Sequence, residues 1–172
     1  MLSEDTHRHL LAFAIDELPG AEFEAWLYAS SELEESLSPD DYLALLAADF
    51  RTPEGIREAQ GTAERLLEAF DPWCVARARV ILVLRGMLNG RVNLLVGLRE
   101  LAHMHHAGYA FIPVEFAGYE GETDTVPEPS QYASWEPQAL ERALQPLYLY
   151  REGILEATGE LLRTLEGQRR AT

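Results

Sequence analysis

The chain has 172 residues, of which 47% are hydrophobic and 25% are charged, and its formal net charge is −15 at pH 7. This composition is typical of one globular domain with its own core, and it argues against intrinsic disorder despite the acidity. All 14 basic residues are arginine. The absence of lysine excludes Schiff-base chemistry and the lysine-dependent phosphate sites of P-loop proteins and protein kinases.

Charge is unevenly distributed along the sequence. Residues 1–71 hold 17 acids and four arginines, residues 72–118 hold two acids and five arginines, and residues 119–172 hold ten acids and five arginines. The middle part is also the most apolar, with Val80 to Val83 and Leu94 to Val96 as its centre. The acidic balance disfavours nucleic acid as a ligand, because phosphate binding needs clustered cations, and it favours a basic partner.

Two features of the sequence indicate the cellular compartment. Met1 to Asp5 contain no basic n-region or apolar h-region, and the longest apolar run, Val80 to Leu84, is far shorter than the roughly 18 residues of a membrane span. Cys74 is the single cysteine, which excludes an internal disulfide and a thiolate zinc cluster. We therefore expect a cytoplasmic protein without a membrane partner.

The apolar pattern predicts a mainly α fold, in which residues 1–172 form a single domain. The expected architecture is a bundle of about seven or eight helices with an irregular or short β excursion near 109–136. In the first half, apolar residues at helical spacing predict helices near 10–18, 23–37, 42–50 and 56–70. A proline after a capping residue marks helix starts at Ser38-Pro39, Thr52-Pro53, Asp71-Pro72 and, more loosely, Trp135-Glu136-Pro137.

In the second half, residues 73–88 are apolar on nearly every side and predict a central buried helix. Asn89-Gly90 then predicts a turn into a helix over 92–106, which Gly108 ends. Residues 109–119 predict an extended connection or a short strand, and residues 120–134 an irregular segment. Helical spacing returns from Pro137 and is interrupted by Pro146, and the tail from 167 to 172 is expected to fray.

Two stretches resemble known groups of proteins. The first comprises Glu22-Phe-Glu-Ala-Trp-Leu-Tyr, Glu32-Leu-Glu-Glu-Ser-Leu and Asp41-Tyr-Leu-Ala-Leu-Leu-Ala-Ala-Asp-Phe. It resembles small helical bacterial proteins of unknown function, some of which are suspected toxin-immunity partners. The second, Gly121-Glu-Thr-Asp-Thr-Val-Pro with Trp135 and the helix opened by Pro137, is similar to another uncharacterised bacterial group. Each likeness covers about a third of the chain. The resemblance implies an interaction protein and brings no catalytic residues.

The irregular acidic segment is the predicted partner-binding surface. Carboxylates accept bidentate bonds from a partner's arginines, and aromatic side chains supply the apolar contact area typical of interface hot spots. The alternative is a solvated loop in which the tryptophan is a structural anchor. A second acidic face contains Glu32, Glu34, Glu35, Asp40 and Asp41. The residues of the predicted surface are Tyr119, Glu120, Glu122, Asp124, Tyr132 and Trp135.

Histidines and the cysteine suggest two further chemistries. His103, His105 and His106, with Glu100 three residues before His103, form a conceivable metal site to which His7 and His9 could add ligands. The alternative is partly exposed histidines near a helix C-terminus. Cys74 lies near a predicted helix start, which can activate a thiol, but no accompanying base is evident and a buried thiol explains it better. No G-x-S-x-G pattern supports a serine nucleophile.

The sequence therefore predicts a binding protein that is not an enzyme and needs no cofactor. The leading hypothesis is an immunity-type inhibitor that occludes a basic partner, such as a toxin or nuclease. The alternative from another class is a small metal-dependent enzyme that uses Glu100, His103 and His106. A third hypothesis is a homodimer formed through the apolar middle of the chain.

Overall fold

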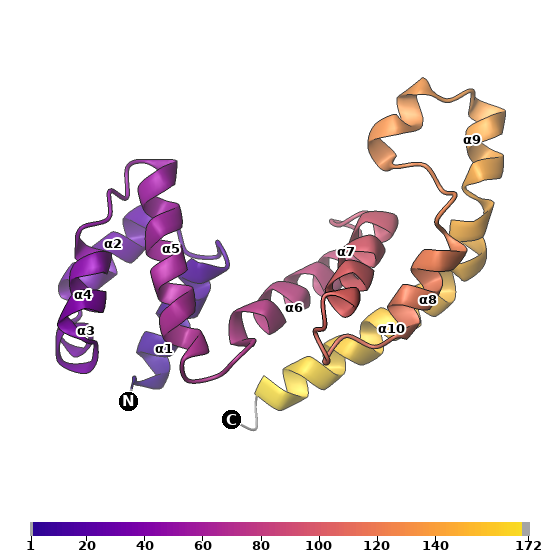
Figure 1. Ribbon diagram of the computed structural model, residues 1–172. Coiled ribbons are helices and arrows are strands. Elements are labelled where there is room, and N and C mark those ends of the chain that lie inside the picture. The colour runs from indigo at the N-terminus through magenta and orange to yellow at the C-terminus, as the bar shows by residue number, and fades with distance from the viewer. Residues whose placement is uncertain (1, 170–172) are drawn as a thin grey trace. The chain divides into compact units, whose positions relative to one another are not determined.

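The computed structural model describes residues 2–169, which form an all-α protein (Figure 1). This range contains ten α-helices and one 3₁₀-helix and no strand. The mainly α prediction is confirmed, whereas the predicted seven or eight helices are too few. Contacts within the chain form two compact units that divide between Arg79 and Val80. We call them unit 1 and unit 2. A single domain over 1–172 stays a prediction.

Unit 1 contains five complete helices around a small aromatic core. The Phe13 and Phe23 rings stack with centroids 3.8 Å apart, and Phe50 packs against both. Serine and threonine caps begin three of these helices, since the side chains of Ser3, Ser38 and Thr52 each accept a backbone N–H of the first turn. The helices are α1 (Glu4–Ala14), α2 (Gly20–Ala29), α3 (Ser31–Ser36), α4 (Pro39–Leu46) and α5 (Pro53–Glu68).

Long-range hydrogen bonds satisfy the carboxyl end of α1. Gln60 of α5 donates its amide to Phe13 O at 3.1 Å, and the Arg79 guanidinium donates to Ala14 O at 3.0 Å. Asp16 then turns the chain with a positive φ of 63° and accepts a second bond from Gln60. Because helix-end carbonyls have no partner within the helix, these two side chains fix α1 against the rest of unit 1.

The start of α6 (Cys74–Leu88) differs from the prediction at Asp71-Pro72. The helix begins two residues later, because Trp73 adopts a positive φ of 72° that cannot continue a right-handed helix. The Asp71 carboxylate pairs with Arg77. The boundary between the two units lies within α6, so the helix contributes residues to both of them.

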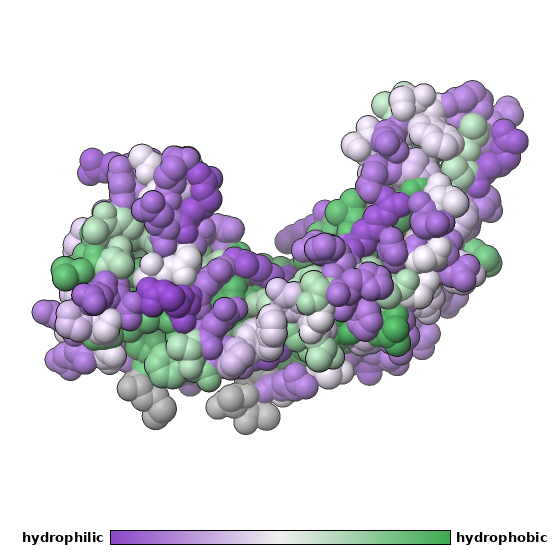
Figure 2. Space-filling view, in the orientation of Figure 1, coloured by the Kyte–Doolittle hydropathy of each residue, from purple (hydrophilic) through white to green (hydrophobic). Residues whose placement is uncertain are grey.

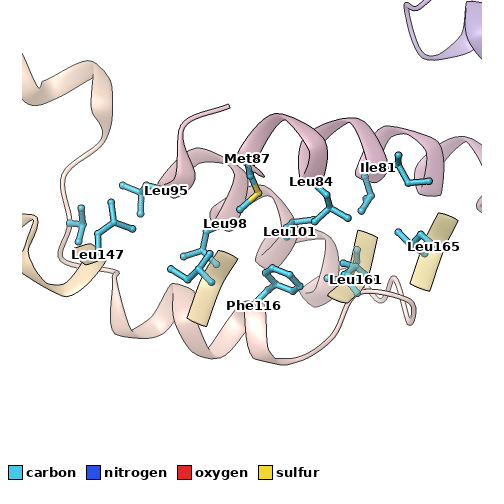
Figure 3. Packing of buried hydrophobic residues seen from close by; sticks show 14 residues of the cluster. Ile81, Leu84, Met87, Leu95, Leu98, Leu101, Phe116, Leu147, Leu161 and Leu165 are labelled. Carbon is cyan, nitrogen blue, oxygen red and sulfur yellow. The ribbon is translucent and has the colours of Figure 1, made fainter. Parts of the chain in front are cut away.

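Unit 2 is built on α6, α7, α8 and α10, whose buried side chains meet in one interior (Figure 3). Leu84 of α6, Leu98 and Leu101 of α7, Phe116 of α8 and Ile154 of α10 are all fully buried there. The predicted Asn89-Gly90 turn is confirmed, with Gly90 at φ 75° between α6 and α7. The remaining helices are α7 (Leu94–His106), α8 (Glu115–Glu122), η1 (Pro129–Ser134), α9 (Pro137–Ala143) and α10 (Gln145–Arg169).

The predicted irregular or short β excursion at 109–136 is wrong for residues 115–122, whereas residues 109–114 and 123–128 are irregular as expected. Residues 115–122 form α8, and residues 129–134 form a 3₁₀ turn. Phe116 of α8 is fully buried in the core of unit 2, and Thr123, which caps the end of the helix, is buried as well. Aromatic and β-branched composition therefore gave a strand signal that burial on one helical face overrides.

Two predictions at the carboxyl end have mixed outcomes. Pro146 interrupts the helical pattern as expected, because α9 ends at Ala143 and Pro146 lies in the first turn of α10. Residues 167–169 belong to α10, although they were expected in a frayed tail, and residues 170–172 lie outside the described residues. Within residues 2–169, every helix is too short or too polar to span a lipid bilayer.

Candidate functional site

The six residues of the predicted partner-binding surface lie in unit 2, in two groups of contacts. Tyr119, Glu120 and Glu122 belong to α8, and Asp124 follows it. Tyr132 lies in η1, and Trp135 is the residue that ends that turn. The surface that the sequence predicts is therefore divided between a core-packed helix and a separate 3₁₀ turn.

The α8 group is largely occupied by contacts with α10. Tyr119 is half-buried against the core, and its ring lies 6.0 Å from that of Tyr150 at an interplanar angle of 53°. The Tyr150 hydroxyl donates to Glu122 Oε2 at 3.2 Å, and this bond to a carboxylate raises the pKa of Tyr150. Tyr119 and Glu122 therefore join two helices, while Glu120 is half-buried and Asp124 is exposed.

The 3₁₀ group is anchored by Arg99 of α7. Its guanidinium pairs with Glu128 and donates to Val126 O at 2.8 Å. Burial, followed by the nearby Tyr148 hydroxyl, raises the pKa of Tyr132, which is half-buried beside this ion pair. Trp135 keeps 39% of its surface exposed. It is the one aromatic residue of the predicted surface with a large free face.

The histidines of α7 have separate surroundings. His105 Nδ1 donates to Ile112 O at 2.8 Å, which ties the end of α7 to the following turn. His103 and Glu100 are exposed, and the His105 and His106 rings meet edge to face at 5.7 Å. His9 stacks on Trp26 in unit 1. Across residues 2–169 no group of three or more His, Cys, Asp or Glu side chains has the geometry to hold a metal ion.

Cys74 has the surroundings of a core residue. Only 7% of its surface is exposed, and burial, with a smaller contribution from the Asp71 carboxylate, raises the pKa of the thiol to about 11. A thiolate is the nucleophilic form, so this environment opposes catalysis by Cys74 at neutral pH.

The strongest charge imbalance lies in unit 1. Residues 1–79 contain 17 acids and six arginines, for a net charge of −11, whereas residues 80–172 contain 12 acids and eight arginines, for a net charge of −4. Residues 9–50 contain ten acids and no arginine or lysine. The acidic balance of the sequence therefore belongs mainly to unit 1.

Part of the second predicted acidic face serves internal contacts. Glu32 of α3 accepts bonds from the Ser3 N–H, the Ser3 hydroxyl and the Thr6 hydroxyl at 2.5–2.7 Å. Asp41 caps α4 with Ser38 and pairs with Arg65 at 2.7 Å. These bonds hold the pKa of both carboxyls below their usual values. Glu34, Glu35 and Asp40 remain exposed.

One surface of unit 1 was missed by the reasoning from sequence. The outward residues of α2 and α4 are mostly apolar, and they include the exposed side chains of Tyr28 and Leu43. The sequence contains a signal for this apolar surface. Both faces of α2 carry apolar residues, so burial of one face leaves apolar residues exposed on the other. Figure 2 shows apolar residues on the part of unit 1 where Figure 1 places α2 and α4.

Comparison with models of known families, with curated proteins and with solved structures found no match for this chain.

Proposed function

We propose that this protein is a bacterial cytoplasmic binding protein of the immunity type, which neutralises a basic protein by occluding a cationic site. The single observation that carries the proposal is the charge of unit 1, a net −11 with no arginine or lysine in residues 9–50. A compact acidic body of this kind attracts cationic surfaces and raises the rate of association with them. The resemblance of residues 22–50 to small bacterial proteins suspected of an immunity role supports the same reading.

The positions of the carboxylates in unit 1 favour a role in binding over a role in catalysis. The carboxylates that have partners, Glu32 and Asp41 among them, hold the helices of unit 1 together. Glu34, Glu35 and Asp40 face solvent on α3 and α4. Exposed acids without a cation between them repel one another weakly in water, and a cationic partner relieves that repulsion.

The test is affinity capture by the full-length protein from extracts of the organism that encodes it. We expect a basic protein, with a calculated pI above about 9, to be retained at low salt, to be released as ionic strength rises, and to re-form a complex of defined stoichiometry after purification. Capture of acidic or neutral proteins alone would contradict the proposal, as would a basic protein that does not re-form the complex.

Two matched variants test whether the acids of unit 1 are responsible. Glu34→Gln, Glu35→Gln and Asp40→Asn remove three charges from α3 and α4, and Glu152→Gln, Glu156→Gln and Glu160→Gln remove three exposed charges from α10. We expect the association rate with the captured protein to fall about tenfold or more for the first variant and far less for the second. Equal effects would mean that net charge alone drives the association.

A further inference from the structure

The outward faces of most long helices in this protein are charged, as is usual for helices packed on a core. On α5 the exposed positions include Arg57, Glu58 and Glu68, and on α10 they include Arg151 and Glu152 beside the exposed Tyr148 and Leu149. Such faces need no partner, because their side chains are well solvated.

The outward faces of α2 and α4 break this rule. Tyr28 is 65% exposed and Leu43 is 59% exposed, and small apolar side chains surround them at helical spacing. We call this set the α2–α4 face. It consists of Ala21, Ala25, Tyr28 and Ala29 of α2 with Leu43, Ala44 and Ala47 at α4, all of them exposed.

Exposed acids occur on the same two helices and on α3, which lies between them in the chain, and we take these acids as the border of the α2–α4 face. Glu22, Glu34, Glu35 and Asp40 are exposed, and within the described residues their carboxylates have no ion pair. Glu32 and Asp41 are excluded from this border because internal bonds hold them. The face therefore combines apolar area with uncompensated negative charge, and Arg65 is paired with Asp41 within unit 1.

We infer that the α2–α4 face is the docking surface for a cationic amphipathic segment of the protein partner. The inference rests on the proposed function and adds the surface and the chemistry of what it binds. An amphipathic segment places its apolar side on the alanines, Tyr28 and Leu43, while its arginines or lysines reach the bordering carboxylates. A second copy of this chain does not fit, because each copy brings the same acids to the contact.

The alanines make close approach of a partner backbone feasible. Small side chains at successive helical turns leave a nearly flat surface, and Tyr28 and Leu43 provide the two large apolar contacts. Burying an exposed tyrosine or leucine at an interface is the kind of contact that sets the dissociation rate, whereas the bordering acids set the association rate.

The experiment uses the full chain and two labelled synthetic peptides. One is a helical peptide of about 18 residues with leucine on one face and arginine on the other, and the second has the same composition in scrambled order. Fluorescence anisotropy measures both dissociation constants at low and physiological salt. We expect the amphipathic peptide to bind at least about tenfold more tightly than the scrambled one.

Paired variants then locate the site. Tyr28→Ser with Leu43→Ser removes the two large contacts of the α2–α4 face, and we expect it to weaken binding of the amphipathic peptide about tenfold. Tyr148→Ser with Leu149→Ser removes two side chains of unit 2 that are 54% and 76% exposed, and we expect no change. Circular dichroism verifies that both variants keep their helix content.

The outcomes separate this inference from the proposed function. Any of three results overturns the inference. The two peptides bind equally well, the two double variants lose the same amount of peptide affinity, or the amphipathic peptide does not bind. The natural partner provides the second measurement. If a captured basic protein binds the Tyr28→Ser and Leu43→Ser variant as tightly as the original, the function stands and the α2–α4 face is not its site. If no basic protein is captured, the function itself fails.

Discussion

Tyr119 Oη occupies the space that a side chain on Gly153 would need. A β-carbon at position 153 would lie 2.5 Å from Tyr119 Oη and 3.1 Å from Cζ of the same ring, both closer than ordinary contact. The absence of a side chain on α10 therefore lets the α8 tyrosine pack where it does. Tyr119, which the sequence predicts as a partner-binding residue, thus has a structural contact within unit 2.

We expect Gly153→Ala to destabilise the protein and Tyr119→Phe to rescue it. Alanine is better than glycine inside a helix by about 1 kcal/mol, but overpacking costs about 1–3 kcal/mol. Removing the hydroxyl removes the closest contact, so Gly153→Ala should become neutral or stabilising in the Tyr119→Phe background. Urea denaturation of the four proteins in the double-mutant cycle measures this, and additive effects would show that the two residues do not meet.

The bonds to Glu32 predict a loss of stability in acid. Bonds from Thr6 and Ser3 hold the pKa of Glu32 below its usual 4.5. A lowered folded-state pKa contributes stability above the unfolded pKa, and this contribution is lost as pH falls through the folded pKa. We expect the melting temperature to fall below about pH 4.5, and Glu32→Gln to lower it at pH 7 and to flatten this part of the profile.

The control for Glu32 is Glu34→Gln on the same helix. Glu34 is exposed and makes no side-chain hydrogen bond or ion pair within the described residues, so the change removes one charge and no hydrogen bond. Its melting temperature at pH 7 should match that of the original protein. Identical profiles for Glu32→Gln and Glu34→Gln would show that the network of Ser3, Thr6 and Glu32 does not form in solution.

Two glycines in helices should respond to alanine in opposite directions. A β-carbon on Gly86 of α6 would lie 2.4 Å from Cγ2 of Val92, which lies in the turn before α7. A β-carbon on Gly61 of α5 would have no atom within 4 Å. We expect Gly86→Ala to destabilise by about 1–2 kcal/mol and Gly61→Ala to stabilise by up to about 1 kcal/mol. Chemical denaturation measures both, and stabilisation by Gly86→Ala would contradict the packing.

Much of the helical fold could be predicted because local signals agreed with burial. Ser38-Pro39 and Thr52-Pro53 combine a side-chain cap with a proline in the first turn, and both begin helices as expected. The prediction from sequence was wrong where a local capping pattern competes with contacts made in the folded protein. Asp71-Pro72 has the same local pattern, but the positive φ of Trp73 delays α6, and the contacts that hold this turn are not visible in a linear pattern.

The candidate site was harder to predict, because exposure and pairing depend on contacts between distant residues. Glu32 and Glu34 look alike in the sequence, yet one lies against Ser3 and Thr6, 29 and 26 residues away, and the other faces solvent. Tyr119 and Tyr28 are both tyrosines near acids, but Tyr119 packs beside Tyr150 of α10, whereas Tyr28 is 65% exposed. The uneven distribution of charge is visible in the sequence. Which acids remain exposed and unpaired depends on the folded structure.

Cys74 should be almost inert in the folded protein. With a pKa of about 11, about one thiol in a thousand is ionised at pH 8, and the side chain is also shielded from reagents. We expect reaction with Ellman's reagent at pH 8 to be slow until guanidinium unfolds the chain, and then fast and stoichiometric. Asp71→Asn should speed the native reaction, because the Asp71 carboxylate contributes to the raised pKa. Rapid labelling of the native protein would contradict the buried environment and reopen a nucleophilic role for Cys74.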